Sequence, residues 1–306
     1  DSCVEVHMKS SPFSLHIQQK LSAYFEAEIS IISAEMVHGG SINECFVLHT
    51  TQGDFFLKRN DAVEFPEMFE HEKEGLQLLH QAGALQVPKV YFSGSFKSSS
   101  YLVLEFLEKD DRIKSETNSA KGWEVLGHGL ARIHQQHGEH YGWKNQNYIG
   151  SLIQVNQENS SWWNFYVQQR LEPMAMKALL EKKISRNLYE QFQKLYVKLE
   201  HLFPIELPAL LHGDLWSGNV MILDVDKAAL FDPAVYYGHR EMDIAMSKLF
   251  GGFHPRFYKA YQESFPLQSG WEERVEIAQL YPLLVHACLF GGGYPKQIEA
   301  ILKKWE

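Results

Sequence analysis

The chain has 306 residues and a net charge of −9, and this negative balance argues against a nucleic-acid-binding protein, which usually carries a basic surface. Its apolar runs are too short to span a bilayer, and no N-terminal stretch has the basic-then-apolar order of a signal peptide. Cys3, Cys45 and Cys288 are far apart and form no CxxC pair, so we expect a cytoplasmic protein without a disulfide framework that contacts neither membranes nor nucleic acids.

The first segments in chain order have the composition of β-strands. Residues 29–37 and 44–50 are rich in β-branched and apolar residues, and residues 53–59 continue this pattern after a Gly-Asp turn. The run HGGSIN at 38–43 is typical of a turn. The pattern predicts an antiparallel meander.

Residues 66–83 have the pattern of a helix, because Pro66 suits a first turn and Gly83 an end. The apolar stripe of this helix consists of Met68, Phe69, Leu76 and Leu79. Glu72 lies in phase with the stripe, and a carboxylate that faces a core needs a cation as its partner.

A further apolar strand is expected at 101–108, followed by a polar stretch at 109–122 that reads as a lobe boundary. We therefore expect two lobes, an N-terminal lobe at 1–107 and a C-terminal lobe at 108–306.

The rest of the chain is predicted to be mainly helical. Helical periodicity extends over 123–137 and 187–203, and residues 269–305 read as two closing helices interrupted by three glycines at 291–293. The fold class that follows is α+β, with a small antiparallel sheet in the first lobe and mostly helices in the second.

A short segment near residue 220 concentrates polar side chains beside apolar runs. Residues 220–223 and 228–231 look like two strands joined by a turn, which would place Asn219 and Asp232 at the same end of a hairpin. Asp214 precedes Asn219 by five residues. The segment is either a set of structural turns or a cation site.

The spacing favours the cation site, because it matches the HRDxxxxN and DFG pattern of kinases. Phosphoryl transfer needs one carboxylate to accept a proton from the attacking hydroxyl, and an amide and a second carboxylate to hold the metal. Here the pattern reads His212-Gly213-Asp214, then Asn219, then Asp232.

A strand lysine paired with a helix glutamate positions ATP phosphates in kinases. Lys58 lies in the expected strand at 53–59, and Glu72 faces the core from the following helix. An ordinary buried salt bridge, or a lysine that reaches solvent, is the alternative.

Three further residues stand where a nucleotide would meet a glycine turn. Gly39 and Gly40 allow backbone approach to phosphate oxygens, and Ser41 adds a donor, although a plain hairpin turn explains them equally well. The backbone of Glu105 and Leu107 falls where a strand leaves the first lobe and is placed to bond an adenine edge.

These features resemble the protein-kinase-like superfamily, on its small-molecule branch with aminoglycoside and choline kinases. Longer segments resemble the fructosamine kinase, or ketosamine kinase, family within it. Those segments are NYIGSLIQVNQ at 147–157, WWNFYVQQRLEP at 162–173, HGDLWSGN at 212–219, DPAVYYGHREMDIAMSKLFGGF at 232–253 and YPLLVHACLFGGGY at 281–294.

The resemblance implies a bilobal fold, in which the lobe at 1–107 binds the nucleotide and the lobe at 108–306 carries the catalytic and acceptor-binding residues. It also implies ATP- and Mg²⁺-dependent phosphorylation of the third hydroxyl of a ketosamine such as fructosamine or ribulosamine. The product would be unstable and release the amine, so that amines and proteins are deglycated. Carried over by position, Asp214 would be the base, Asn219 and Asp232 the Mg²⁺ ligands, and Lys58 the phosphate contact with Glu72 as partner. Asp243 matches an acid that braces the catalytic loop, and we interpret it as structural.

Candidate acceptor contacts follow the base. The indole of Trp216 offers a flat face for sugar C–H groups, with a core tryptophan as the alternative. His239, Arg240 and Glu241 form a polar run that either lines the acceptor cleft or begins a solvated helix.

The chain departs from the kinase pattern at Gly213, which replaces the arginine of HRD, so we expect no regulation by a phosphorylated loop. Two other functions stay open: another small-molecule kinase of the choline or aminoglycoside type, and a nucleotide-binding pseudokinase. The preferred ketose, the choice between free and protein-bound substrate, and the oligomeric state do not follow from the sequence.

Overall fold

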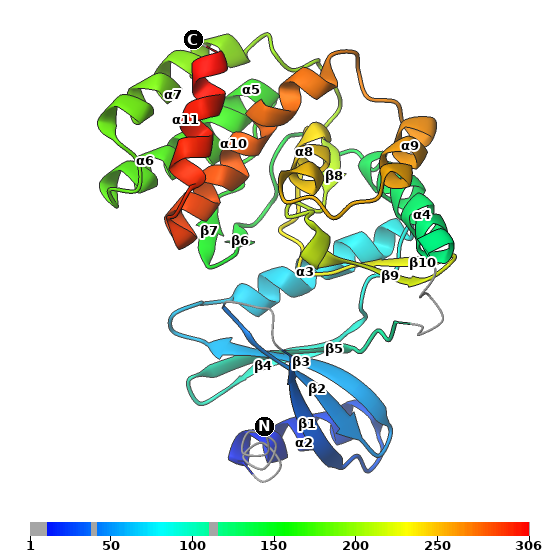
Figure 1. Cartoon of the computed structure of the whole chain (residues 1–306). Helices are drawn as coiled ribbons and strands as arrows, with labels where there is room; N and C mark the ends of the chain where they lie inside the picture. Colours follow the sequence, from blue (N-terminus) through cyan, green and yellow to red (C-terminus); the bar gives the residue numbers. More distant parts are fainter. Residues whose placement is uncertain (1–10, 38–41, 110–115, 306) are drawn as a thin grey trace. The chain divides into compact units, whose positions relative to one another are not determined.

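The computed structural model describes residues 11–37, 42–109 and 116–305 (Figure 1). Backbone contacts divide the chain into two compact units. The N-terminal unit comprises residues 1–80 and 87–108, and the C-terminal unit comprises residues 81–86 and 109–306. No helix in the described ranges is long and apolar enough to cross a membrane.

The N-terminal unit contains a five-stranded antiparallel sheet in the order β1-β2-β3-β5-β4. Its strands are β1 (Ile31–Val37), β2 (Glu44–Thr50), β3 (Gly53–Asp61), β4 (Val90–Phe96) and β5 (Ser99–Glu105). The meander of the first three strands and the strand near residue 101 are confirmed. The edge strand β4 was not predicted, because its VYFSGSF sequence mixes aromatic residues with turn formers.

Two helices belong to the N-terminal unit. Helix α2 (Pro12–Phe25) was not predicted; Ser11 caps it by accepting the Ser14 N–H, and Ile17 and Leu21 are fully buried in the core of the sheet. Helix α3 (Met68–Ala82) confirms the predicted helix, including its buried apolar stripe.

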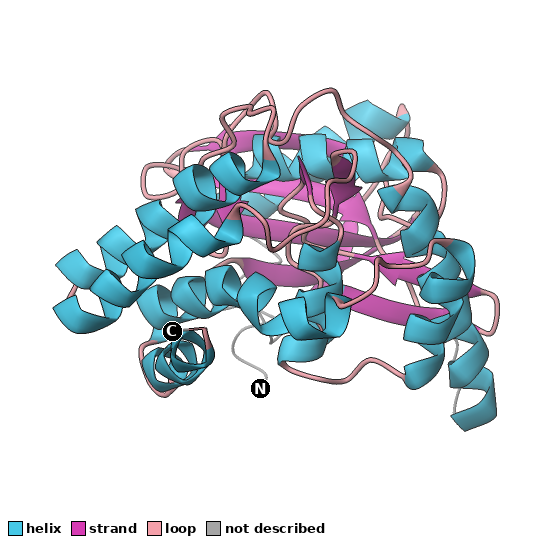
Figure 2. Ribbon diagram, turned by 90° about the horizontal axis from the view of Figure 1, so that it is seen from above, coloured by secondary structure: helices cyan, strands magenta, loops and turns pink. Residues whose placement is uncertain are grey.

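Figure 2 marks the helices and strands of the whole chain, and the C-terminal unit is mainly helical, with short strands. Its helices are α4 (Glu116–His134), α5 (Trp162–Phe165), α6 (Glu172–Leu180), α7 (Arg186–Leu199), α8 (Glu241–Leu249), α9 (Pro255–Ser264), α10 (Trp271–Phe290) and α11 (Tyr294–Lys304), with a π-helical segment η1 (Tyr166–Leu171) and a 3₁₀ turn η2 (Ser217–Asn219). The predicted helices at 123–137, 187–203 and 269–305 are confirmed. The polar stretch at 109–122 is not a linker throughout, because α4 already begins at residue 116.

Three two-stranded antiparallel ribbons complete the C-terminal unit. They pair β6 (Asn147–Ile149) with β7 (Leu152–Gln154), β8 (Ala209–Leu211) with β11 (Tyr236–Gly238), and β9 (Val220–Asp224) with β10 (Lys227–Leu230). Helix α10 crosses the core of this unit, where Leu280, Leu283 and Leu284 are almost completely buried. Positive φ angles at Gly291 and Gly292 separate α10 from α11.

Candidate active site

The β9-β10 hairpin places two of the predicted site residues beside each other. Val220 pairs with Leu230, and the Phe231 N–H donates to the Asn219 carbonyl oxygen at 2.9 Å. Asn219 and Asp232 therefore lie at the same end of the hairpin, as the sequence predicts. Asp232 is exposed and has a φ of 49°, a left-handed conformation that costs energy for a non-glycine residue and is frequent at functional sites.

Asn219 binds the loop that carries Asp214. Its Nδ2 donates to the backbone oxygen of Asp214 at 2.9 Å and to the Asp214 Oδ2 at 3.1 Å. Because the amide nitrogen is occupied in this way, the orientation of the Asn219 side chain is set and its Oδ1 is turned toward other partners. The structure thus brings Asp214, Asn219 and Asp232 together in the C-terminal unit.

Burial and, to a smaller extent, the nearby charge of Asp232 outweigh the hydrogen bond from Asn219 and together raise the pKa of Asp214 to about 7. Two carboxyl groups close together repel each other, and a cation between them relieves that repulsion. The electrostatics of the site are therefore those of a cation-binding site.

The loop before Asp214 is held by its backbone. Asp243, in the first turn of α8, accepts the N–H groups of His212 at 2.7 Å and Gly213 at 2.9 Å, and binds His134 Nε2 at 3.1 Å. Burial acts to raise the pKa of Asp243, but the hydrogen bond and charge of His134 outweigh it, so the pKa is lowered. The prediction that Asp243 is structural is confirmed.

The surroundings of His212 and Gly213 explain why a glycine replaces the arginine of the HRD pattern. The His212 Nδ1 accepts the Asp214 N–H at 3.2 Å and its Nε2 donates to the Phe231 oxygen at 2.7 Å, while burial lowers its pKa, so the ring is neutral. Gly213 has a φ of 85°, and a Cβ there would lie 2.0 Å from the Ala234 oxygen. No side chain fits at this position, and an arginine is therefore excluded.

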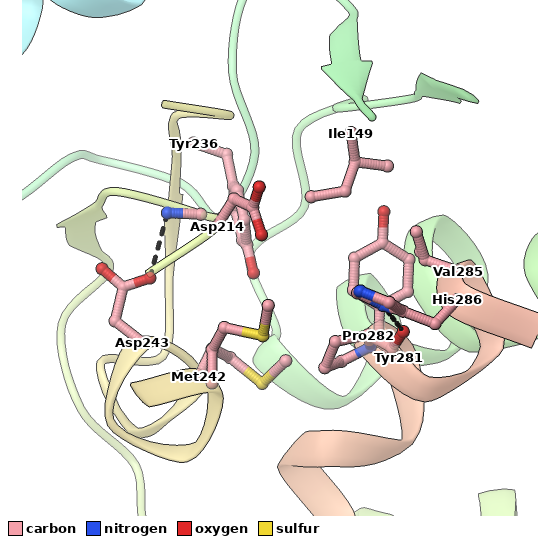
Figure 3. A pocket seen from close by; sticks show the side chains of 11 residues that line it. Ile149, Asp214, Tyr236, Met242, Asp243, Tyr281, Pro282, Val285 and His286 are labelled. Carbon is pink, nitrogen blue, oxygen red and sulfur yellow. Dashed lines mark hydrogen bonds between the residues drawn. The ribbon is translucent and has the colours of Figure 1, made fainter. Parts of the chain in front are cut away.

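A pocket of about 360 Å³, including its open mouth, lies in the C-terminal unit beside Asp214 (Figure 3). It is lined by Ile149, Gly213, Asp214, Tyr236, Met242, Asp243, Met246, Tyr281, Pro282, Val285 and His286. The His286 Nδ1 donates to the Pro282 oxygen at 2.7 Å, which leaves Nε2 as an acceptor. The lining combines apolar side chains with a few polar groups, which is typical of a small-molecule site.

Several lining residues were not predicted from the sequence, although their segments at 232–253 and 281–294 stood out. Tyr281 and His286 interrupt a mostly apolar run at 280–290, and this is the signal that could have pointed to them. Their common position in one pocket depends on the packing of α10 beside the loop that carries Asp214.

Trp216 is not a core residue. It is 36% exposed, and its indole packs edge to face with Phe250, with 6.4 Å between the ring centroids. The ring also covers Gly218, where a Cβ would lie 2.2 Å from it. The ring centroids of Phe250 and His286 lie 4.8 Å apart. Trp216 is therefore connected to His286 in the pocket wall through the ring of Phe250.

The polar run predicted to line an acceptor cleft consists of His239, Arg240 and Glu241. The structure corrects this interpretation, because all three side chains are buried and their polar atoms are used inside the fold. Arg240 binds Glu206 through two hydrogen bonds of 2.8 Å, and Glu241 binds Arg274 at 2.7 and 2.9 Å. His239 Nε2 donates to a backbone oxygen at 3.2 Å. We assign these residues a structural role.

The predicted lysine–glutamate pair forms in the N-terminal unit. Lys58 Nζ lies 2.6 Å from Glu72 Oε1, and the Lys58 side chain is almost completely buried. Glu105 ends β5, where its N–H donates to the Lys89 oxygen at 2.8 Å, and Leu107 follows as a buried residue. The predicted phosphate contacts Gly39, Gly40 and Ser41 lie outside the described residues.

The donor set near Asp214 fits a magnesium ion that is also held by phosphate oxygens. The described residues contain no cluster of three or more His, Cys, Asp or Glu side chains placed to bind a metal. One amide oxygen, from Asn219, and one carboxylate, from Asp232, are the protein ligands offered, and Mg²⁺ commonly takes few protein oxygens when phosphates complete its shell.

Comparison with known proteins assigns the class. The family model described as fructosamine kinase matches residues 13–305. A “probable ketoamine kinase” of Enterococcus faecium is 38% identical over 88% of this chain and 94% of that protein. A crystal structure described as a “putative fructosamine-3-kinase” of Haemophilus somnus has a TM-score of 0.83 at 30% identity, covering 94% of this chain and 96% of that one.

An aminoglycoside phosphotransferase, APH(4)-Ia, has a TM-score of 0.62 at 15% identity, covering 94% of this chain and 99% of that one, and this likeness shows the fold alone. The fold is therefore the predicted protein-kinase-like one, and the chain is a phosphotransferase. It belongs to the fructosamine kinase family.

Proposed function

We propose that the protein is an ATP- and Mg²⁺-dependent ketosamine kinase, which phosphorylates the third hydroxyl of a ketosamine such as fructosamine or ribulosamine. The observation that carries the proposal is the Asp214 carboxylate, oriented by Asn219 at the wall of a pocket. The ketoamine and fructosamine-3-kinase descriptions of the relatives support this choice of acceptor.

In this proposal Asp214 accepts the proton of the acceptor hydroxyl as it attacks the γ-phosphate. Asn219 keeps the carboxylate in place, and the neutral His212 ties the loop to the end of β10. When bound, Mg²⁺ neutralises charge on the phosphates, and Asn219 Oδ1 and Asp232 are the groups that would hold it. Trp216 offers an exposed ring face to the sugar.

The nucleotide contacts belong to the N-terminal unit. Lys58, oriented by Glu72, binds phosphate oxygens. Gly39, Gly40 and Ser41, which lie outside the described residues, are carried over from the sequence as phosphate contacts, and the backbone of Glu105 and Leu107 as the group that binds the adenine edge. Phosphorylation of a ketosamine gives an unstable product that releases the amine, so the reaction deglycates amines and proteins.

Mg²⁺-dependent release of ADP from ATP tests the proposal, with fructosyl-lysine, ribulosyl-lysine, choline and an aminoglycoside as acceptors. Turnover of a ketosyl-lysine that disappears in Asp214→Asn supports it and ranks the sugars. Turnover of choline or the aminoglycoside alone would contradict the substrate while leaving the kinase. ATP binding without turnover of any acceptor would indicate a pseudokinase.

A further inference from the structure

Two segments that mark the family, 147–157 and 162–173, hold none of the catalytic, metal or nucleotide residues proposed above, and they contribute only Ile149 to the pocket lining. In the structure they supply polar side chains that are buried behind the pocket. These side chains are Asn147, Gln154, Asn156 and Arg170, each 5% exposed or less. Buried polar groups are costly unless they are paired, so a network of this size calls for a reason.

Arg170 is the most unusual member. Its side chain is fully buried, and within the described part of the chain no carboxylate lies within ion-pair distance of it. Its guanidinium instead donates to the Val155 oxygen at 2.6 Å, to the Gln169 oxygen at 3.0 Å and to Asn156 Oδ1 at 2.6 Å. Its Nε has no hydrogen-bond partner among the described residues.

Aromatic rings surround this cation. The guanidinium carbon lies 4.1 Å from the ring centroid of Tyr236, 4.6 Å from that of Phe165 and 5.4 Å from that of Tyr281. Tyr236 and Tyr281 also line the pocket (Figure 3), so these two residues contact both the pocket and the buried cation.

The network gives every hydrogen bond a direction. Arginine can only donate, so Asn156 receives with Oδ1 and donates from Nδ2 to Asn147 Oδ1 at 2.9 Å. Gln154 Nε2 donates to the same oxygen at 2.9 Å, and its Oε1 is left to accept the Tyr281 hydroxyl at 2.9 Å. The hydroxyl proton of Tyr281 is therefore used in the hydrogen bond to Gln154. The hydroxyl oxygen can still accept a hydrogen bond through a lone pair.

The backbone around Arg170 supports a functional role independently. Residues 166–171 form the π-helical segment η1, and such segments are rare and frequent at functional sites. Tyr166 anchors this segment to α10, because its hydroxyl donates to the Ile277 oxygen at 2.6 Å. Helix α10 is the one that carries Tyr281 and His286 into the pocket.

We propose that Tyr281 determines acceptor specificity by accepting a hydrogen bond from a sugar hydroxyl other than the one that is phosphorylated, and that Arg170 is its positioning residue. The proposal rests on the proposed function. A neutral hydroxyl is the favoured partner, because the cationic Arg170 beside the ring repels the ammonium group of a ketosamine. The amine of the substrate therefore lies away from Tyr281.

Steady-state kinetics with Tyr281→Phe on a ketosyl-lysine and its monodeoxy analogues test the contact. We expect kcat/KM on the parent acceptor to fall about tenfold, mostly through KM, because one hydrogen bond is lost. For the analogue that lacks the contacted hydroxyl we expect no change, and the KM for ATP should stay constant. An equal loss on the parent and on every analogue would show a purely structural tyrosine and overturn the proposal.

Arg170→Met should reproduce the loss of discrimination between the parent and that one analogue, and Arg170→Lys should restore part of it. The matched control is Arg274→Lys on the helix of Tyr281, which weakens a buried ion pair outside the pocket. The control should lower Tm without changing discrimination. An Arg170→Met enzyme that is folded by thermal melting and still discriminates like the wild type would overturn the role of Arg170.

The two proposals fail separately. If the wild type turns over another acceptor and no ketosamine, the proposed function fails, and the same variants are compared on that acceptor and its monodeoxy derivatives. If the wild type turns over ketosamines and Tyr281→Phe loses activity uniformly, only the specificity proposal fails. A wild type that phosphorylates no acceptor at all would overturn both.

Discussion

The catalytic loop at 212–219 and the polar run at 239–241 look alike in sequence, since each combines a histidine, an acid and aromatic neighbours. In the loop, the backbone is held by Asp243, and the Asp214 carboxylate stays at a pocket wall. In the run, the side chains themselves are used, because Arg240 binds Glu206 and Glu241 binds Arg274. The difference teaches that a polar side chain is available for chemistry when other groups hold its backbone.

Asp214→Asn is expected to have the largest effect on activity and therefore tests this contrast most strongly. We expect kcat to fall by about 10³-fold or more, because the proposed proton acceptor is lost. Tm should stay equal or rise, because the repulsion with Asp232 disappears. Kinetics and a thermal melt on the same preparation check both, and a large fall in Tm would break the contrast.

Arg240→Met should lower stability and leave activity unchanged, which is the opposite of what we expect for Asp214→Asn. Leaving Glu206 buried without its partner should cost about 3–5 kcal/mol of unfolding free energy. The activity per folded molecule should be unchanged at a temperature where the variant is native. Urea unfolding and active-site-normalised kinetics check this, and a selective rise in the acceptor KM would restore the role in substrate binding.

Gly213→Ala should have an intermediate effect on both kcat and the free energy of unfolding. The new Cβ would meet the Ala234 oxygen and stand at a positive φ, so we expect a loss of about 2 kcal/mol in stability. Because the loop must shift to admit the Cβ, kcat should fall as well. Gly251→Ala is the matched control, since it shares a positive φ but meets no atom within 4 Å.

The smallest effect concerns pH. Burial lowers the pKa of His239 below 6.5, although the charges of Glu241 and Glu206 act to raise it and that of Arg240 to lower it. The unfolded chain then binds the proton more readily, so stability is complete above pH 6.5 and falls as the pH decreases below it. We expect Tm to decrease between about pH 7.5 and about pH 5.5, and to do so less steeply in His239→Gln. Equal slopes of Tm against pH in the wild type and in His239→Gln would show that His239 does not cause the decrease.

Local patterns made much of the fold predictable. The strands, the hairpin and the spacing of Asp214, Asn219 and Asp232 depend on residues close in sequence, and the structure brings these three together as expected. Their catalytic roles and the division of labour between the lobes stay predictions.

The sequence could not show which residue, far away along the chain, pairs with each buried polar side chain. Glu206 lies 34 residues before Arg240 and Arg274 lies 33 after Glu241, so their ion pairs left no local signal. Tyr281 meets Gln154 across 127 residues, and for the same reason the network behind the pocket could not be foreseen.

Asp243 has a consequence for how activity responds to heat. Its carboxylate joins α8 to the loop before Asp214 and, through His134, to α4. Because two helices hold it, the loop should loosen only when the C-terminal unit itself unfolds. Any loss of activity below the melting temperature of the C-terminal unit should therefore come from the N-terminal unit and not from this loop.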